Sequence, residues 1–101
     1  MPNYNSYEFF EESINSVLNQ TYTNFDLIIV DDGSTSKKVS DIYNKYKLLK
    51  NIKIIVTENR GLPNARNEGL NNSNAEFVTF LDSDDRFDSK ALEVFRNNHK
   101  N

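Results

Sequence analysis

The stretch LIIVDDGS at residues 27–34 decides the fold class of this 101-residue chain. Its first four residues are all apolar, without the alternation of a strand that faces water on one side. Such a run is typical of a strand covered on both faces, as in a parallel sheet. The next four residues, DDGS, favour a turn. We therefore expect a buried parallel strand that ends in a turn carrying two carboxylates.

Helical and extended patterns alternate on both sides of that strand. Apolar residues at intervals of three and four predict helices over residues 5–20, 36–49 and 89–98. A short helix is predicted over residues 64–71, with Gly69 near its end. Apolar runs predict further strands over residues 52–56 and 77–81. Asn5 and Glu8 have the spacing of a capping box for the first helix. Because helices separate successive strands, we expect an α/β fold with a parallel sheet and helices on both faces.

Length and composition exclude several classes of protein. A chain of 101 residues is expected to form one domain over residues 1–101, and its net charge of −3 argues against binding of nucleic acid through a basic surface. Cysteine is absent, which excludes disulfides and cysteine-based zinc sites, and the only histidine, His99, lies near the end. No apolar run approaches the roughly 20 residues of a membrane helix. We expect a cytoplasmic protein, with peripheral attachment to the inner face of the membrane as an alternative.

Acidic clusters follow two of the three predicted strands. Asp31-Asp32 ends the first, and Asp82-Ser83-Asp84-Asp85 ends the last. Parallel strands place these ends on the same edge of the sheet, where ligands of open α/β sheets bind. Gathered carboxylates repel one another unless a cation lies between them, and oxygen ligands suit Mg²⁺ or Mn²⁺. The pattern indicates a metal-assisted site for a phosphorylated ligand, and the alternative is that these aspartates only cap helices and form turns.

Two further residues are candidates for ligand binding. Arg66 lies at the start of the short predicted helix, near Gly61, where it could pair with a diphosphate. Tyr4 precedes the first helix and could stack on a nucleobase. Taken alone, each has a simpler interpretation, which is a surface salt bridge for Arg66 and packing on the core for Tyr4.

Six short motifs occur in a fixed order along the chain. They are Pro2-Asn3-Tyr4-Asn5, residues 16–22 (SVLNQTY), residues 29–34 (IVDDGS), Asn59-Arg60-Gly61, Ala65-Arg66-Asn67 and residues 80–85 (FLDSDD). Together they resemble the nucleotide-sugar-binding half of family 2 glycosyltransferases, which have the Rossmann-like GT-A fold. The resemblance extends from Pro2 to about Phe87.

The resemblance implies roles for the nucleotide-binding residues. Pro2 and Tyr4 would line the nucleoside pocket, with Tyr4 against the base. Asp32 would hydrogen-bond the base, usually uracil in this family, and Asp31 would be structural. Arg66 would reach the base or the diphosphate.

The same resemblance implies a metal site. Asp82 and Asp84 match the Asp-x-Asp motif of the family. Asp84 would ligate the Mn²⁺ or Mg²⁺ that bridges the diphosphate, and Asp82 would face the ribose or a metal-bound water. Asp85 is a weaker candidate ligand.

The implied reaction moves a sugar from a nucleotide-diphosphate donor, which the resemblance implies is a UDP-sugar, to an acceptor hydroxyl. The enzyme would be of the hexosyltransferase kind, and its acceptor a glycan or a lipid-linked molecule in polysaccharide synthesis. The general base normally belongs to the acceptor-binding half, and no residue here matches it. We therefore assign no catalytic residue and expect no sugar transfer by these 101 residues alone. The alternative is a non-catalytic nucleotide-binding fragment or a degenerate remnant.

One departure from the family concerns the sheet. The usual first strand precedes Pro2 and is missing, and Met1 corresponds to its last residue. In the family it lies between the strands ending at Asp31 and Asp82, so both would have unpaired edges. Unpaired apolar edges favour association with other chains, and we expect a homo-oligomer rather than direct pairing of the two strands.

Overall fold

The computed structural model describes residues 1–75 and 78–98 as a three-stranded sheet with four helices. The elements are β1 (Pro2–Asn3), α1 (Phe10–Leu18), β2 (Leu27–Asp31), α2 (Lys37–Tyr46), β3 (Ile52–Val56), α3 (Leu62–Asn71) and α4 (Ala91–Asn98). The strands lie in the order β1-β2-β3, and both pairings are parallel. The predicted α/β class with a parallel sheet is confirmed.

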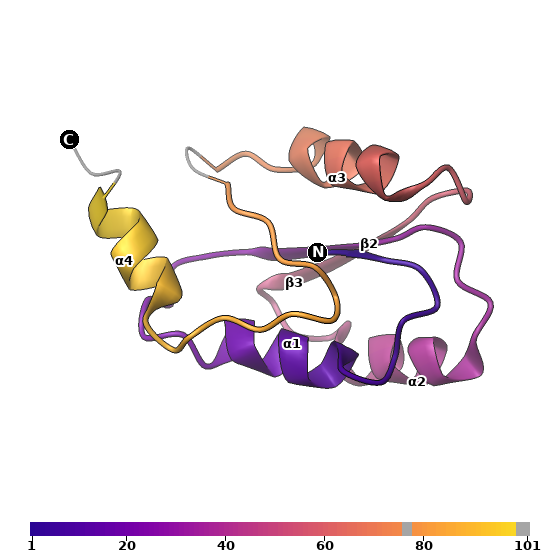
Figure 1. The fold of residues 1–101 in the computed structure, drawn as a ribbon, viewed down its shortest axis with the longest axis horizontal. Helices are drawn as coiled ribbons and strands as arrows, with labels where there is room; N and C mark the ends of the chain where they lie inside the picture. The colour runs from indigo at the N-terminus through magenta and orange to yellow at the C-terminus, as the bar shows by residue number, and fades with distance from the viewer. Residues whose placement is uncertain (76–77, 99–101) are drawn as a thin grey trace.

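Helices cover both faces of the sheet (Figure 1). Helices α1 and α2 lie on one face, and the core forms between them and the sheet. Its buried residues are Phe10, Ile14, Val17, Leu27, Ile29, Val39, Tyr46 and Ile52. Helix α3 lies on the other face, where a Cβ built on Gly69 would meet Val30 Cγ2 at 3.4 Å. Leu27 and Ile29 therefore face one layer and Val30 the other, which explains why this strand is apolar from Leu27 to Val30.

Strand β1 is a two-residue strand that pairs with β2 on the side opposite β3. Pro2 pairs with Val30 and Asn3 with Asp31. The Met1 amine donates to the Ile28 carbonyl at 2.9 Å, and the Val30 N–H donates to the Met1 carbonyl at 3.0 Å. The prediction that this edge of β2 is unpaired is therefore wrong for the second half of the strand, which pairs with residues 1–3.

The predicted strand over residues 77–81 is wrong for its described part. Residues 78–81 are irregular, and Phe77 lies outside the described residues. Val78 and Phe80 are 36% and 48% exposed. A further strand would have to pair with the outer edge of β1, which is two residues long and includes Pro2, a residue without an N–H to donate. Too few ladder bonds are available there to hold an extended segment.

The helix ends also differ from those predicted. The capping box of Asn5 and Glu8 is wrong, because α1 begins only at Phe10 and Asn5 adopts a positive φ of 52°. The Asn5 side-chain oxygen instead accepts the N–H groups of Thr35 and Ser36 at 2.8 and 2.9 Å, at the start of α2. Helix α3 begins two residues before its predicted start because Pro63 fits the first turn of a helix.

Candidate functional site

The carboxylate of Asp32, directly after β2, is buried and accepts three hydrogen bonds from the chain. Its Oδ1 accepts the Thr57 hydroxyl at 3.0 Å and the Arg60 N–H at 2.9 Å, while Oδ2 accepts the Gly61 N–H at 2.8 Å. The side chain is 1% exposed. The Arg60 N–H, together with the Gly61 N–H and the Thr57 hydroxyl, lowers the pKa of Asp32 despite the opposing effect of burial. Asp32 therefore holds the loop that joins β3 to α3.

Asp31, the last residue of β2, is buried beside it and holds a different loop. Its Oδ2 accepts the Ser34 N–H at 3.0 Å, and its Oδ1 accepts the Tyr43 hydroxyl at 2.6 Å. Burial, together with the bond to Asp31, raises the pKa of the Tyr43 hydroxyl. The Asn3 side chain donates to the same hydroxyl at 3.1 Å. This cluster ties β1, β2 and α2 together.

The second acidic cluster is a turn at residues 82–85. The Asp85 N–H donates to the Asp82 carbonyl at 3.0 Å and closes the turn. One carboxylate oxygen from each of Asp82, Asp84 and Asp85 lies within 4.8 Å of the others. Asp84 and Asp85 are exposed, and Asp82 is half-buried. Such a set of three oxygen ligands fits a hard divalent cation.

Arg66 and Asp82, both predicted to bind nucleotide, form an ion pair with a distance of 2.8 Å between Nη2 and Oδ1. Their side chains are 37% and 48% exposed. The guanidinium from α3 therefore lies at the acidic turn and compensates part of its charge. A pair this accessible to water contributes little to folding, so both groups can exchange their partner for a ligand at small cost.

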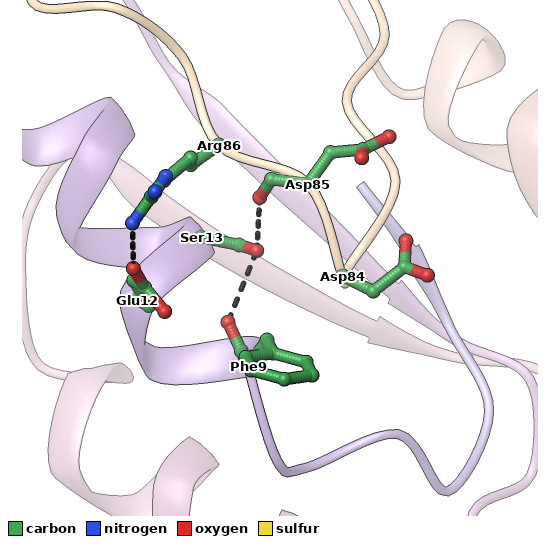
Figure 2. Close-up of a pocket in the computed structure, with 6 residues that line it drawn as sticks. All are labelled: Phe9, Glu12, Ser13, Asp84, Asp85 and Arg86. Carbon is green, nitrogen blue, oxygen red and sulfur yellow. Dashed lines mark hydrogen bonds and ion pairs between the residues drawn. The ribbon is translucent and has the colours of Figure 1, made fainter.

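The structure brings some predicted site residues together and separates others. Asp84 and Asp85 line a cavity of about 440 Å³ with Phe9, Glu12, Ser13 and Arg86 (Figure 2). Pro2 and Arg66 line a groove of about 990 Å³ that runs past β1, β2 and α3. Tyr4 is 42% exposed beyond β1, as a stacking residue would need to be. The carboxylates of Asp31 and Asp32 do not join the acidic turn, contrary to the expectation that all the acids gather at one cation.

Three residues of the site were missed in the sequence. Ser13 bonds to the acidic turn, and Ser16 and Gln20 bond to the segment that follows it. Their spacing of three and four residues puts them on one side of α1, beside the apolar residues that the periodicity identified. The signal in the sequence that could have identified them is this row of polar residues beside the apolar residues of an amphipathic helix.

The part of the chain that the structure describes has no helix with the length and hydropathy to cross a membrane.

Known proteins resemble this chain along almost its whole length. The profile of glycosyl transferase family 2 matches residues 1–101. An uncharacterized glycosyltransferase of Haemophilus influenzae is 43% identical over 94 residues, covering 92% of this chain and 38% of that protein. The poly(ribitol-phosphate) beta-N-acetylglucosaminyltransferase TarP of Staphylococcus aureus is 41% identical over 100 residues, covering 96% of this chain and 31% of TarP.

A solved structure agrees with these relatives. The crystal structure of Staphylococcus aureus TarS 1–349 in complex with UDP-GlcNAc matches with a TM-score of 0.84 and 33% identity, over 97% of this chain and 30% of that one. The chain spans well under half the length of each of these proteins. With a profile match from the first residue to the last and a matching fold, the chain belongs to glycosyl transferase family 2.

Proposed function

We propose that this chain is the donor-binding part of a metal-dependent glycosyltransferase, with a UDP-sugar as its donor. The observation that carries the proposal is the acidic turn, where three carboxylates lie within 4.8 Å of one another beside the Arg66 guanidinium. Carboxylates alone repel a diphosphate. A diphosphate can bind here only where positive charge offsets that repulsion, and Arg66 supplies just one such charge.

The three carboxylates of the turn suit a divalent cation as ligands. Asp84 and Asp82 would hold Mn²⁺ or Mg²⁺, with Asp85 as the third ligand within reach. A bound divalent cation would offset the charge of the diphosphate and stabilise the negative charge that develops on the leaving group. Arg66 can then release Asp82 and donate to two oxygens of a phosphate in the bidentate manner that guanidinium groups favour.

The nucleoside would lie on the side of β1. Pro2 and Tyr4 flank Asn3 there, and Tyr4 has the exposed ring that stacking on a base requires. Asp32 accepts three hydrogen bonds from the chain, two at Oδ1 and one at Oδ2. A carboxylate oxygen has two acceptor positions, so one remains at Oδ2 for an N–H of uracil.

The finer identity of the reaction rests on the relatives. TarP is named as an N-acetylglucosaminyltransferase, and the TarS structure holds UDP-GlcNAc. By analogy we propose transfer of a hexose-type sugar to a hydroxyl of a glycan or lipid-linked acceptor in cell-surface polysaccharide synthesis. The reaction would take place in the cytoplasm, at the inner face of the membrane. Association into a homo-oligomer stays a prediction, tested by light scattering at several protein concentrations.

The deciding experiment is calorimetric titration of UDP into the chain, once with Mn²⁺ and once with EDTA. We expect UDP to bind in Mn²⁺ and its affinity to be at least roughly tenfold lower in EDTA. Without the cation, the carboxylates face the diphosphate with nothing to offset their repulsion. Asp84→Asn should remove most of this difference. Asp88→Asn is the matched control, since Asp88 is an exposed acid of the same segment whose side chain contacts only the nearby Lys90 N–H among the described residues.

Two results would count against the proposal. Equal affinity for UDP in Mn²⁺ and EDTA would remove the role of the cation. Absence of UDP binding under both conditions would favour the alternative, a degenerate chain that keeps the fold without the ligand.

A further inference from the structure

Ser13, Ser16 and Gln20 form a polar line along α1 and just beyond its end, and each bonds to the segment that contains and follows the acidic turn. We call these three residues the polar line. They belong to an otherwise apolar side of the helix, and Ser13 and Gln20 are buried. A buried polar side chain keeps its place only when its hydrogen bonds are made, so the partners of these three show what the line does.

Ser13 contacts the acidic turn itself. Its hydroxyl lies 3.0 Å from the Ser83 carbonyl. The same hydroxyl also bonds to the Asp85 carbonyl, as Figure 2 shows. These two carbonyls flank Asp84 on either side. The hydroxyl has one proton to share between them and the Phe9 carbonyl at 3.1 Å. The backbone on both sides of Asp84 is thus held at one point on α1.

Ser16 and Gln20 hold the chain further on. The Phe87 N–H donates to the Ser16 hydroxyl at 3.0 Å, while that hydroxyl donates to the Ser13 carbonyl at 2.7 Å. The Gln20 amide donates to the Asp88 carbonyl at 2.6 Å and accepts the Leu92 N–H, at the start of α4, at 2.9 Å. The polar line therefore follows the main chain from residue 83 to residue 92, where no strand supplies a ladder.

Other contacts of this segment are weaker constraints on the turn. The ion pair of Glu12 and Arg86 is exposed, and exposed pairs contribute little. Leu81 and Phe87 pack against the core on either side of the turn, but apolar contacts are not directional and do not fix the direction of the carbonyls between them. Ser13 is the contact that acts on the backbone within the turn.

We propose that Ser13 is a positioning residue for the cation site, because it holds the carbonyls of Ser83 and Asp85 and thereby sets the direction in which Asp84 and Asp85 point. This inference rests on the proposed function, since it assigns Ser13 a role at the proposed cation. Ser16 and Gln20 extend the same attachment away from the site and serve the stability of the segment.

The test measures Mn²⁺ affinity by calorimetry in Ser13→Ala and Gln20→Ala. Ser13→Ala should weaken Mn²⁺ binding roughly three- to tenfold, the size of one lost hydrogen bond, while Gln20→Ala should leave it within about twofold. Gln20→Ala is the matched control because it also detaches the segment from α1 but at residues 88 and 92. All titrations are made well below each variant's unfolding temperature.

Two additional measurements separate positioning from folding. Ser13→Thr keeps the hydroxyl and should restore at least half of the affinity lost in Ser13→Ala on a logarithmic scale. Hydrogen exchange at the Asp85 amide, which donates to the Asp82 carbonyl and closes the turn, should be faster in Ser13→Ala than in the wild type. If the Asp85 amide is equally protected from exchange in Ser13→Ala and in the wild type, Ser13 does not hold the turn in place, and the proposal is overturned.

The remaining outcomes are distinguishable. A wild-type chain that binds Mn²⁺ and a Ser13→Ala chain that binds it equally well would overturn the positioning role alone. A wild-type chain that binds no Mn²⁺ would overturn the proposed cation site, and the role of Ser13 at that site with it.

Discussion

The two acidic clusters of this chain look alike in sequence and behave in opposite ways in the structure. Asp31 and Asp32 are 4% and 1% exposed, and backbone N–H groups and hydroxyls bond to their carboxylates. Asp84 and Asp85 are exposed, and within residues 1–75 and 78–98 their carboxylates have no hydrogen-bond donor or basic group as partner. The chain itself supplies nearly all the hydrogen bonds of the first cluster, which keeps one acceptor position at Asp32 Oδ2, whereas the carboxylates of Asp84 and Asp85 offer all of theirs.

The difference comes from what surrounds each cluster. Asp32 faces the loop of residues 57–61, whose N–H groups point at it, and Asp31 faces Tyr43 from α2. The turn at residues 82–85 lies at the surface, held from behind by Ser13. A buried carboxylate with its donors stabilises the fold, and an exposed cluster without them opposes it by mutual repulsion. Removal of charge should therefore have opposite effects in the two clusters.

The largest expected effect is in Asp32→Asn. The substitution puts an amide N–H where the carboxylate accepted N–H groups, and it should lower the free energy of unfolding by about 3 kcal/mol. Urea unfolding followed by circular dichroism measures this loss. Asp84→Asn is the control of equal charge change, and a similar loss there would break the contrast between the clusters.

Acid should also lower the free energy of unfolding, because it protonates Asp32 in the first cluster. The pKa of Asp32 is lower in the folded chain than its usual 3.8, so its contribution is complete above that value and is lost as the pH falls through the folded-state pKa. Between pH 7 and pH 3 the wild type should lose more stability than Asp32→Asn, which has no such group. Equal losses would show that other carboxyl groups govern the acid response.

A smaller effect is expected for Tyr43→Phe. It removes the hydroxyl that donates to Asp31 and accepts from Asn3, and it should cost about 1–2 kcal/mol. Asp31 stays buried and keeps its bond from Ser34. The urea midpoint measures the change. A neutral result would mean that water replaces the hydroxyl and that the site is less enclosed than the contacts indicate.

The smallest expected effect has the opposite sign. Asp85→Asn keeps the carbonyl that bonds to Ser13 and removes one of three neighbouring negative charges. In EDTA and low salt it should raise the free energy of unfolding by up to about 0.5 kcal/mol, an increase that salt screens. Thermal unfolding at two salt concentrations measures it. If Asp85→Asn instead lowers the free energy of unfolding, the Asp85 carboxylate stabilises the fold, as those of Asp31 and Asp32 do.

Elements defined by local pattern were predicted well from the sequence. The apolar run of residues 27–30 gave β2 to within one residue, and β3 matches its predicted bounds of residues 52–56. The short helix before Asn71 was also found. For the two strands the residues alone favour one structure, because a continuous apolar run is a local property.

Elements that depend on distant partners were not predicted. Residues 78–81 have the composition of a strand, but a strand needs a partner, and β1 offers too short an edge. Asn5 has the spacing of a cap for α1 but bonds to residues about 30 positions away at α2. In the site, the sequence identified the acids without showing which were buried. It also left Ser13 unassigned, since its partners are some 70 residues further along.

The attachment of α4 has a consequence for how this molecule opens. Helix α4 lies at one end of the molecule (Figure 1), contains no buried residue, and is held by Gln20 at Leu92 and by Thr21 at Glu93. Its release exposes little additional apolar surface, so the free energy of that opening should depend only weakly on denaturant concentration and add little to the heat capacity of unfolding. In native-state hydrogen exchange, the free energy of opening of α4 should then fall only slightly with denaturant concentration. That of the sheet should be larger and fall steeply.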